Sequence, residues 1–182
     1  MINRESGREQ TRKYLQEQLS KIHLPSIMYI IDWSSRHNYD YWNKSFSNAS
    51  SVDNADIIKT IYDPSVSGFN LPKTAAYTGL TYSGGRETDP ARFNVSGSFN
   101  KGWNFYTNGW KQGDVFFCYA LGFRDIEGLA GAIVNVTISG GVWLAGAVSS
   151  AKGRFVSFFS SLVDPQNTNT RSKGFSIRPT LE

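Results

Sequence analysis

The chain has 182 residues, a formal net charge of +4 and one cysteine. This length predicts one domain, over residues 1–182, that can bury a normal hydrophobic core. The lysines and arginines are scattered rather than gathered in a run, so the charge does not indicate a nucleic-acid partner. A lone cysteine excludes an internal disulfide and a cysteine-based zinc cluster.

The N-terminal region resembles neither a targeting segment nor a membrane segment. The first twenty residues are polar and charged, unlike a secretory signal peptide, and no apolar run of the chain is long enough to span a membrane. We therefore expect no direct membrane insertion. Either the protein is not exported by the signal-peptide route, or its natural N-terminus lies further upstream.

The first quarter of the chain predicts a helix followed by a strand. Residues 1–8 are expected to be disordered. Residues 9–22 favour a helix, because apolar side chains recur there at i, i+4 and i+7, and Pro25 ends it. Residues 26–33 are apolar through their middle, which is typical of a central strand. Residues 34–56 are polar and aromatic, as in an ordered surface loop.

The middle of the chain predicts short strands with long connections. A short helix is expected at 73–80, between a proline and a glycine. Alternation of apolar and polar residues predicts a hairpin from 92–99 and 103–108. The strongest strand signal is at 115–121, and the β-branched run 133–138 is also typical of a strand. Together these elements predict a single α+β domain.

The end of the chain, residues 140–179, predicts two strands joined by a polar loop. Apolar residues occupy both alternation phases of 155–159, and successive strand side chains point to opposite faces. Val156 and Phe158 are expected to enter the core. The opposite face carries three residues: Phe155, Ser157 and Phe159. That second face is either covered by another layer or exposed as an apolar patch, which usually marks a binding surface.

Three blocks of the chain resemble a known family. They are KTIYDP with GFNLP (59–72), FNVSGSFNKGWNFYTN (93–108) and SSLVDPQNTNTRSKGFSIRP (160–179). They resemble the C-type-lectin-like variable proteins of diversity-generating retroelements in gut Bacteroidetes and their phages, which are related to the Fibrobacter-type paralogous domain. The resemblance covers roughly residues 27–179. It implies an α+β, C-type-lectin-like fold of short, mostly antiparallel strands, long loops and one or two helices, in which the first strand pairs with residues 176–178.

The resemblance also implies a binding surface in the end block, with 140–179 as the candidate variable region. In this family, adenine-directed mutagenesis diversifies Asn codons of that block. The corresponding positions here are the candidate ligand-binding residues: Phe155, Ser157, Phe159, Leu162, Asp164, Gln166, Thr168, Thr170 and Lys173. Gln166 and Lys173 require more than adenine changes in an Asn codon. The resemblance predicts that these side chains form one contiguous, exposed face.

Catalysis and metal binding are not expected. The related formylglycine-generating enzymes work through a pair of cysteines, whereas this chain has only Cys118, which we expect to be buried and unreactive. A calcium site at 164–167 would have one carboxylate, which is too few. We expect no catalytic residue, metal or cofactor. Trp103 and Trp143 are expected in the core, while Trp42 and Trp110 remain open as sugar-stacking rings.

These expectations lead to a functional hypothesis. The resemblance implies a non-catalytic module that displays a hypervariable surface and recognises a protein or glycan on a cell surface. Its setting would be a phage tail or a bacterial surface adhesin, and an oligomer is possible. The alternative is a structural subunit domain of a fimbrial tip or virion, in which the same face is buried in the assembly.

Overall fold

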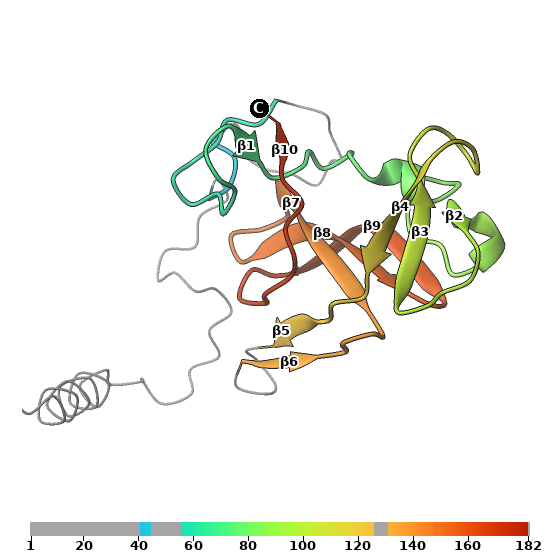
Figure 1. Ribbon diagram of the computed structural model, residues 1–182. Coiled ribbons are helices and arrows are strands. Elements are labelled where there is room, and N and C mark those ends of the chain that lie inside the picture. The colour runs from blue at the N-terminus through green and yellow to red at the C-terminus, as the bar shows by residue number, and fades with distance from the viewer. Residues whose placement is uncertain (1–40, 45–55, 126–130, 182) are drawn as a thin grey trace, which may run out of the picture.

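The computed structural model describes residues 41–44, 56–125 and 131–181 (Figure 1). The disorder expected at 1–8, the helix at 9–22 and the strand at 26–33 all lie outside the described residues. The pairing expected between the first strand and residues 176–178 therefore stays a prediction.

The secondary structure of the described residues is almost entirely β. Ten strands form four small sheets, and every paired strand runs antiparallel to its neighbour. The strands are β1 (Phe69–Asn70), β2 (Val95–Ser96), β3 (Gly102–Tyr106), β4 (Val115–Tyr119), β5 (Phe123–Asp125), β6 (Ala132–Val134), β7 (Gly140–Ala147), β8 (Lys152–Phe159), β9 (Leu162–Thr170) and β10 (Thr180–Leu181). The described residues also form two 3-10 helices, η1 (Thr78–Leu80) and η2 (Pro90–Arg92).

The expected α+β architecture is wrong for the part of the chain that the structure describes, where the only helices are these two 3-10 elements. The helix expected at 73–80 consists of turns that end in η1. A run of this length does not offset the cost of helix nucleation, and Tyr77 at the start of η1 provides no side-chain cap. The C-type-lectin-like α+β fold implied by the resemblance is therefore replaced by a set of antiparallel sheets.

The expected hairpin in the middle of the chain is confirmed. β3 pairs with β2 on one side and with β4 on the other, with Phe105 opposite both Val95 and Phe116. The strand expected at 133–138 is shorter than the sequence suggests, since β6 ends at Val134. Asn135 and Thr137 have φ angles of 57° and 66°, and this left-handed conformation interrupts an extended strand.

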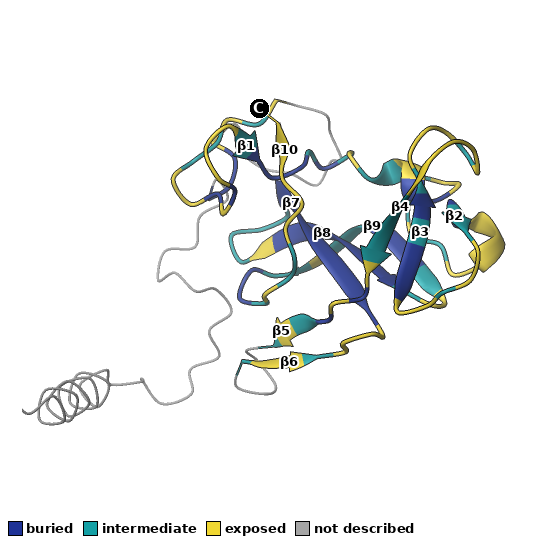
Figure 2. Cartoon of the chain, viewed as in Figure 1, coloured by how far each residue is buried: buried dark blue, intermediate teal, exposed yellow. Residues whose placement is uncertain are grey.

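The largest sheet has the order β7-β8-β9 and passes through the middle of the molecule. Val142 lies opposite Val156 and Trp143 opposite Phe155, and the register between β8 and β9 shifts between Phe155 and Ser157. Every residue of β7 and most of β8 are buried (Figure 2). A strand buried on both faces has apolar residues in both alternation phases, which explains the pattern at 155–159.

One face of this sheet belongs to what we call the first core. Its buried members are Leu80, Phe93, Trp103, Phe105, Ala120, Val142, Leu144, Val156, Phe158 and Val163. They fill the space between the β7-β8-β9 sheet and the β2-β3-β4 sheet. The expected burial of Val156 and Phe158 is confirmed, at 2% and 0% exposure. Each such side chain contributes about 1.5–3 kcal/mol through removal of apolar area from water.

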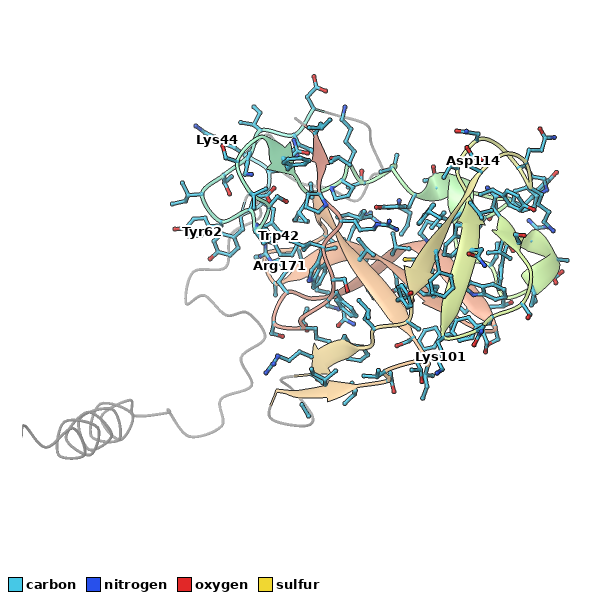
Figure 3. All side chains as sticks on the ribbon, viewed as in Figure 1. Trp42, Lys44, Tyr62, Lys101, Asp114 and Arg171 are labelled. Carbon is cyan, nitrogen blue, oxygen red and sulfur yellow. The ribbon has the colours of Figure 1, made fainter. Side chains whose placement is uncertain are left out.

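The opposite face belongs to the second core, whose buried members are Tyr41, Trp42, Leu71, Trp143, Ala145 and Phe155. Phe175 packs against this core and stacks on the Phe155 ring at a centroid distance of 4.2 Å. The guanidinium carbon of the buried Arg171 lies 4.8 Å from the Tyr41 ring centroid and 5.9 Å from that of Trp42 (Figure 3). Desolvated cation–π contacts of this kind are worth about 2 kcal/mol, so Arg171 helps to hold residues 41–44 against the sheet.

At the Gly140–Gly141 pair, aromatic rings pack closely on both faces of β7. A Cβ at Gly140 would overlap the ring of Phe158 in the first core. A Cβ at Gly141 would overlap the ring of Phe175 beside the second core. Glycine is therefore required at both positions by close packing of rings on the two faces of the strand.

The end of the chain returns to the early part of the described structure. Gly174 bridges to Arg124 and Ser176 bridges to Val142. β10 then pairs with β1, with Leu181 opposite Phe69. Figure 1 shows β10 lying beside β1.

Candidate functional site

The structure does not place the nine predicted binding positions on one exposed face. Phe155, Ser157 and Asp164 are buried, with 4%, 4% and 8% exposure. Thr168 is exposed. The remaining five are half-buried: Phe159, Leu162, Gln166, Thr170 and Lys173. The prediction of a contiguous, solvent-exposed surface is therefore wrong.

The reason for this burial is the second core. Alternation does send Phe155 away from Val156 and Phe158, as the sequence predicts, but Trp143 and Phe175 pack on that side. Asp164 is turned inward, where a carboxylate oxygen accepts the Gln166 backbone N–H at 3.0 Å. A ligand cannot reach these side chains while the two cores are intact.

Cys118 is half-buried in β4 rather than fully buried. Burial raises the pKa of its thiol, and this effect outweighs the opposite influence of Arg178, which lowers the pKa. The influence of that arginine could not be predicted from the sequence, because it lies sixty positions further along the chain. A thiol held in its protonated form is a weak nucleophile, so its reactivity is expected to be low, as the sequence predicts.

An aromatic groove of about 450 Å³ opens at the edge of the β2-β3-β4 sheet. One wall comes from residues 76–82, around η1, and the other from residues 106–110, which begin at the last residue of β3. Asp114, labelled in Figure 3, lies close to the second wall, since its carbonyl oxygen accepts a hydrogen bond from the backbone N–H of Thr107. The lining residues are Ala76, Tyr77, Gly79, Leu80, Thr81, Tyr82, Asn94, Tyr106, Thr107, Gly109, Trp110 and Phe116.

Two rings at the groove form what we call the aromatic corner, Tyr82 and Trp110. Their centroids lie 5.3 Å apart with an interplanar angle of 75°, an edge-to-face arrangement that the ring quadrupoles favour. Tyr82 is 67% exposed and Trp110 is half-buried. Arg92 stands over the Tyr82 ring at 5.0 Å and Lys111 over the Trp110 ring at 5.4 Å. These cations limit the motion of both rings.

A single buried side chain joins the two walls of the groove. Asn94, which is 3% exposed, donates from Nδ2 to the carbonyl oxygens of Gly79 at 2.8 Å and Gly109 at 3.0 Å. Its Oδ1 accepts the Lys111 backbone N–H at 2.7 Å. The amide thereby satisfies groups from both walls, so the groove is held open without a ligand.

Tyr77 also lines the groove, where burial raises the pKa of its hydroxyl. The group therefore stays protonated at any physiological pH and can donate a hydrogen bond. The other polar lining groups are hydroxyls and an amide. Among the described residues, no group of three or more His, Cys, Asp and Glu could hold a metal ion. The lining thus offers aromatic rings and uncharged hydrogen-bonding groups to a ligand.

Sequence reasoning found only part of this site. It did not decide whether Trp110 is a core residue or a sugar-stacking ring, and in the structure this ring lines the groove. It assigned no role to Tyr77, Tyr82 or Asn94, because residues 76–82 and 106–110 show no shared pattern. The other open tryptophan, Trp42, is buried against Trp143 with ring centroids 5.1 Å apart, which excludes it as a sugar platform.

Two further findings bear on the identity of the chain. None of the helices in the described ranges has the length and hydropathy needed to cross a bilayer. No protein-family model matches the sequence, and neither a curated protein nor a solved structure matches the chain.

Proposed function

We propose that this protein is a non-catalytic module that binds a protein or glycan on a cell surface, with the aromatic groove as its contact site. The observation that carries the proposal is the aromatic corner, in which an exposed tyrosine and a half-buried tryptophan border a preformed groove. Exposed aromatic rings next to fixed polar groups are typical of ligand sites and of binding hot spots.

The groove is a better candidate than the end block because its walls are fixed while its rings still reach solvent. Asn94 holds the walls at three hydrogen bonds, and no core residue has to move to admit a ligand. Preorganisation of this kind lowers the entropy cost of binding. The end block, by contrast, supplies much of both cores.

A diversified surface, as the family resemblance implies, is proposed only for the end-block residues that reach the solvent. Thr168 is exposed, and Phe159 and Leu162 are half-buried where β8 turns into β9. A setting in a phage tail or a bacterial surface adhesin rests on the same resemblance. A reverse transcriptase gene and an adenine-rich near-copy of the end block beside this gene would support it.

The experiment that tests the proposed function is a binding screen with the full chain. Immobilised protein is offered a glycan array, intact gut bacteria and a panel of their purified surface proteins. We expect saturable binding to at least one of these ligands, which is recovered chemically unchanged. Tyr82→Ala, at the groove, is expected to weaken this binding. Tyr119→Ala is its matched control, because Tyr119 is 65% exposed but does not line the groove. Absence of saturable binding to all three would contradict the proposal.

The alternative, a structural subunit domain, is favoured by a different observation. Six large apolar residues near β4–β6 and the C-terminal segment are 37–65% exposed: Tyr119, Leu121, Ile133, Val136, Ile138 and Ile177. Leu121 lines both of the shallow hollows beside the segment 174–178. Apolar surface of this kind is often buried between subunits. Light scattering of the wild type and of Leu121→Asp tests this, since an assembly through this surface would dissociate in the variant.

A further inference from the structure

We propose that the aromatic groove binds a neutral glycan, with a sugar ring stacked on the aromatic corner of Tyr82 and Trp110. This inference rests on the proposed function and specifies its ligand. The C–H groups of a pyranose ring form an apolar face of about the size of an aromatic side chain, while the hydroxyls at its edge both donate and accept hydrogen bonds. A site for such a ring needs exposed aromatic surface with uncharged polar groups beside it.

The size of the groove favours a ring-sized ligand over a protein surface. Its volume of about 450 Å³ lies in the range of small-ligand sites, whereas a stable protein interface buries on the order of 800 Å² on each partner. Its two walls are fixed relative to each other through Asn94. The groove therefore accepts one or a few rings of an oligosaccharide, with the rest of the chain extending into solvent.

The polar side chains of the lining include both hydrogen-bond acceptors and a donor, as binding of sugar hydroxyls requires. Thr81 donates its hydroxyl hydrogen to the Gly85 carbonyl at 2.8 Å, and Thr107 donates its own to the Asp114 carbonyl at 3.0 Å. Thr81 is only 3% exposed, whereas Thr107 is exposed, so the Thr107 oxygen is the one whose lone pairs can accept a hydrogen bond from a sugar hydroxyl. The protonated hydroxyl of Tyr77 supplies a donor in return.

The charges around the groove indicate a neutral sugar rather than an acidic one. None of the lining residues is charged at neutral pH. Of the two cations beside the aromatic corner, Arg92 forms an ion pair with Glu87 at 2.8 Å, and Lys111 donates to the Ala91 carbonyl at 2.8 Å. A carboxylate or sulfate on the ligand would compete with Glu87 for Arg92, so an acidic group would add little to the binding free energy.

The test uses an array of neutral oligosaccharides of glucose, galactose, mannose and N-acetylglucosamine, with oligogalacturonate and sialyllactose as acidic counterparts. Calorimetry then measures the dissociation constant of the full chain for the best neutral oligosaccharide. We expect Tyr82→Ala and Trp110→Ala each to weaken it at least tenfold. Tyr119→Ala, the same change at an exposed tyrosine elsewhere, is expected to leave it within twofold of the wild-type value.

A steric variant keeps the test decisive if Trp110→Ala fails to fold. Gly79 lines the groove, and a Cβ added there meets no atom within 4 Å. Gly79→Trp therefore fills open space while both rings of the corner remain, and it is also expected to weaken binding at least tenfold. Thermal melts confirm that each variant is folded.

The inference is overturned by an acidic sugar that binds better than every neutral one, or by neutral binding that Tyr82→Ala and Gly79→Trp leave unchanged. It is also overturned if no oligosaccharide binds. In that last case, binding of a bacterial surface protein in the wider screen would leave the proposed function standing, so the two failures are distinguishable.

Discussion

The end block, residues 140–179, and the two walls of the groove, residues 76–82 and 106–110, use aromatic side chains in opposite ways. In the end block, Trp143 and Phe155 are almost wholly buried, and Phe175 packs against them. At the groove, Tyr82 is largely exposed and meets Trp110 edge to face. An aromatic residue therefore becomes core or contact surface according to what lies opposite it, and its own local pattern does not decide between these outcomes.

If the end block were diversified, as the family resemblance implies, some of the substitutions would fall on buried positions. Substitution at Phe155, Ser157 or Asp164 would alter the interior of the molecule, because all three are buried. Substitution at Tyr82 or Trp110 would alter a surface. The contrast between the two regions can be tested by substitutions in each.

The largest effect is expected from truncating the rings on the two faces of β8. Phe158→Ala removes a ring from the first core and Phe155→Ala removes one from the second. Each is expected to lower the free energy of unfolding by about 3–5 kcal/mol, because a buried ring is lost and a cavity remains. Chemical denaturation measures both, with Phe159→Ala as a half-buried control of smaller effect. A stable Phe155→Ala protein would restore the exposed-face hypothesis.

The next effect comes from adding a methyl group to β7. Gly140→Ala and Gly141→Ala each force a Cβ against a ring, on opposite faces of the same strand. Overpacking of this kind is expected to cost about 1–3 kcal/mol, measured by the same denaturation experiment. Gly79→Ala is the matched control, because its added Cβ meets open space. If one of the two β7 variants were as stable as that control, the corresponding face would be less closely packed than described.

A smaller effect on stability is expected at the groove. Tyr82→Ala removes a ring that is 67% exposed, so the free energy of unfolding is expected to change by less than about 0.5 kcal/mol, as at most surface positions. Thermal melts of this variant and of Phe155→Ala provide the direct comparison between the two regions. A loss as large as that of Phe155→Ala would mean that Tyr82 is structural rather than part of a contact surface.

The smallest effect concerns Cys118, whose pKa is raised by burial. A raised pKa means that the folded state favours the protonated thiol. The stabilisation is complete below the pKa of a free thiol, about 8.5, and is lost as pH rises through the higher pKa of the folded protein. Stability of the wild type is therefore expected to fall more steeply than that of Cys118→Ala above that pH.

Thiol labelling gives a second measurement on the same group. At pH 7 a thiol reagent is expected to react more slowly with the native protein than with the unfolded chain, since less thiolate is present and the side chain is half-buried. Equal rates in the two states would show that burial does not protect Cys118.

Much of the local β-structure and its alternation could be predicted from the residues alone. The hairpin of β2 and β3, the strand β4 and the inward direction of Val156 and Phe158 all follow from side-chain period and β-propensity, which act over a few residues. The prediction of a helix at 73–80 is wrong, because the formation of so short a helix depends on caps and on packing that its own residues do not reveal.

Which faces of the strands meet solvent depends on contacts that form between distant parts of the chain. Periodicity shows that Phe155 and Ser157 lie away from Val156, but not that Phe175, Trp143 and Arg171 cover that side of the sheet. The groove likewise needs two segments about thirty residues apart, joined by the hydrogen bonds of Asn94. Burial and site geometry depend on contacts between distant parts of the chain. A local pattern does not show which distant segment will pack against it.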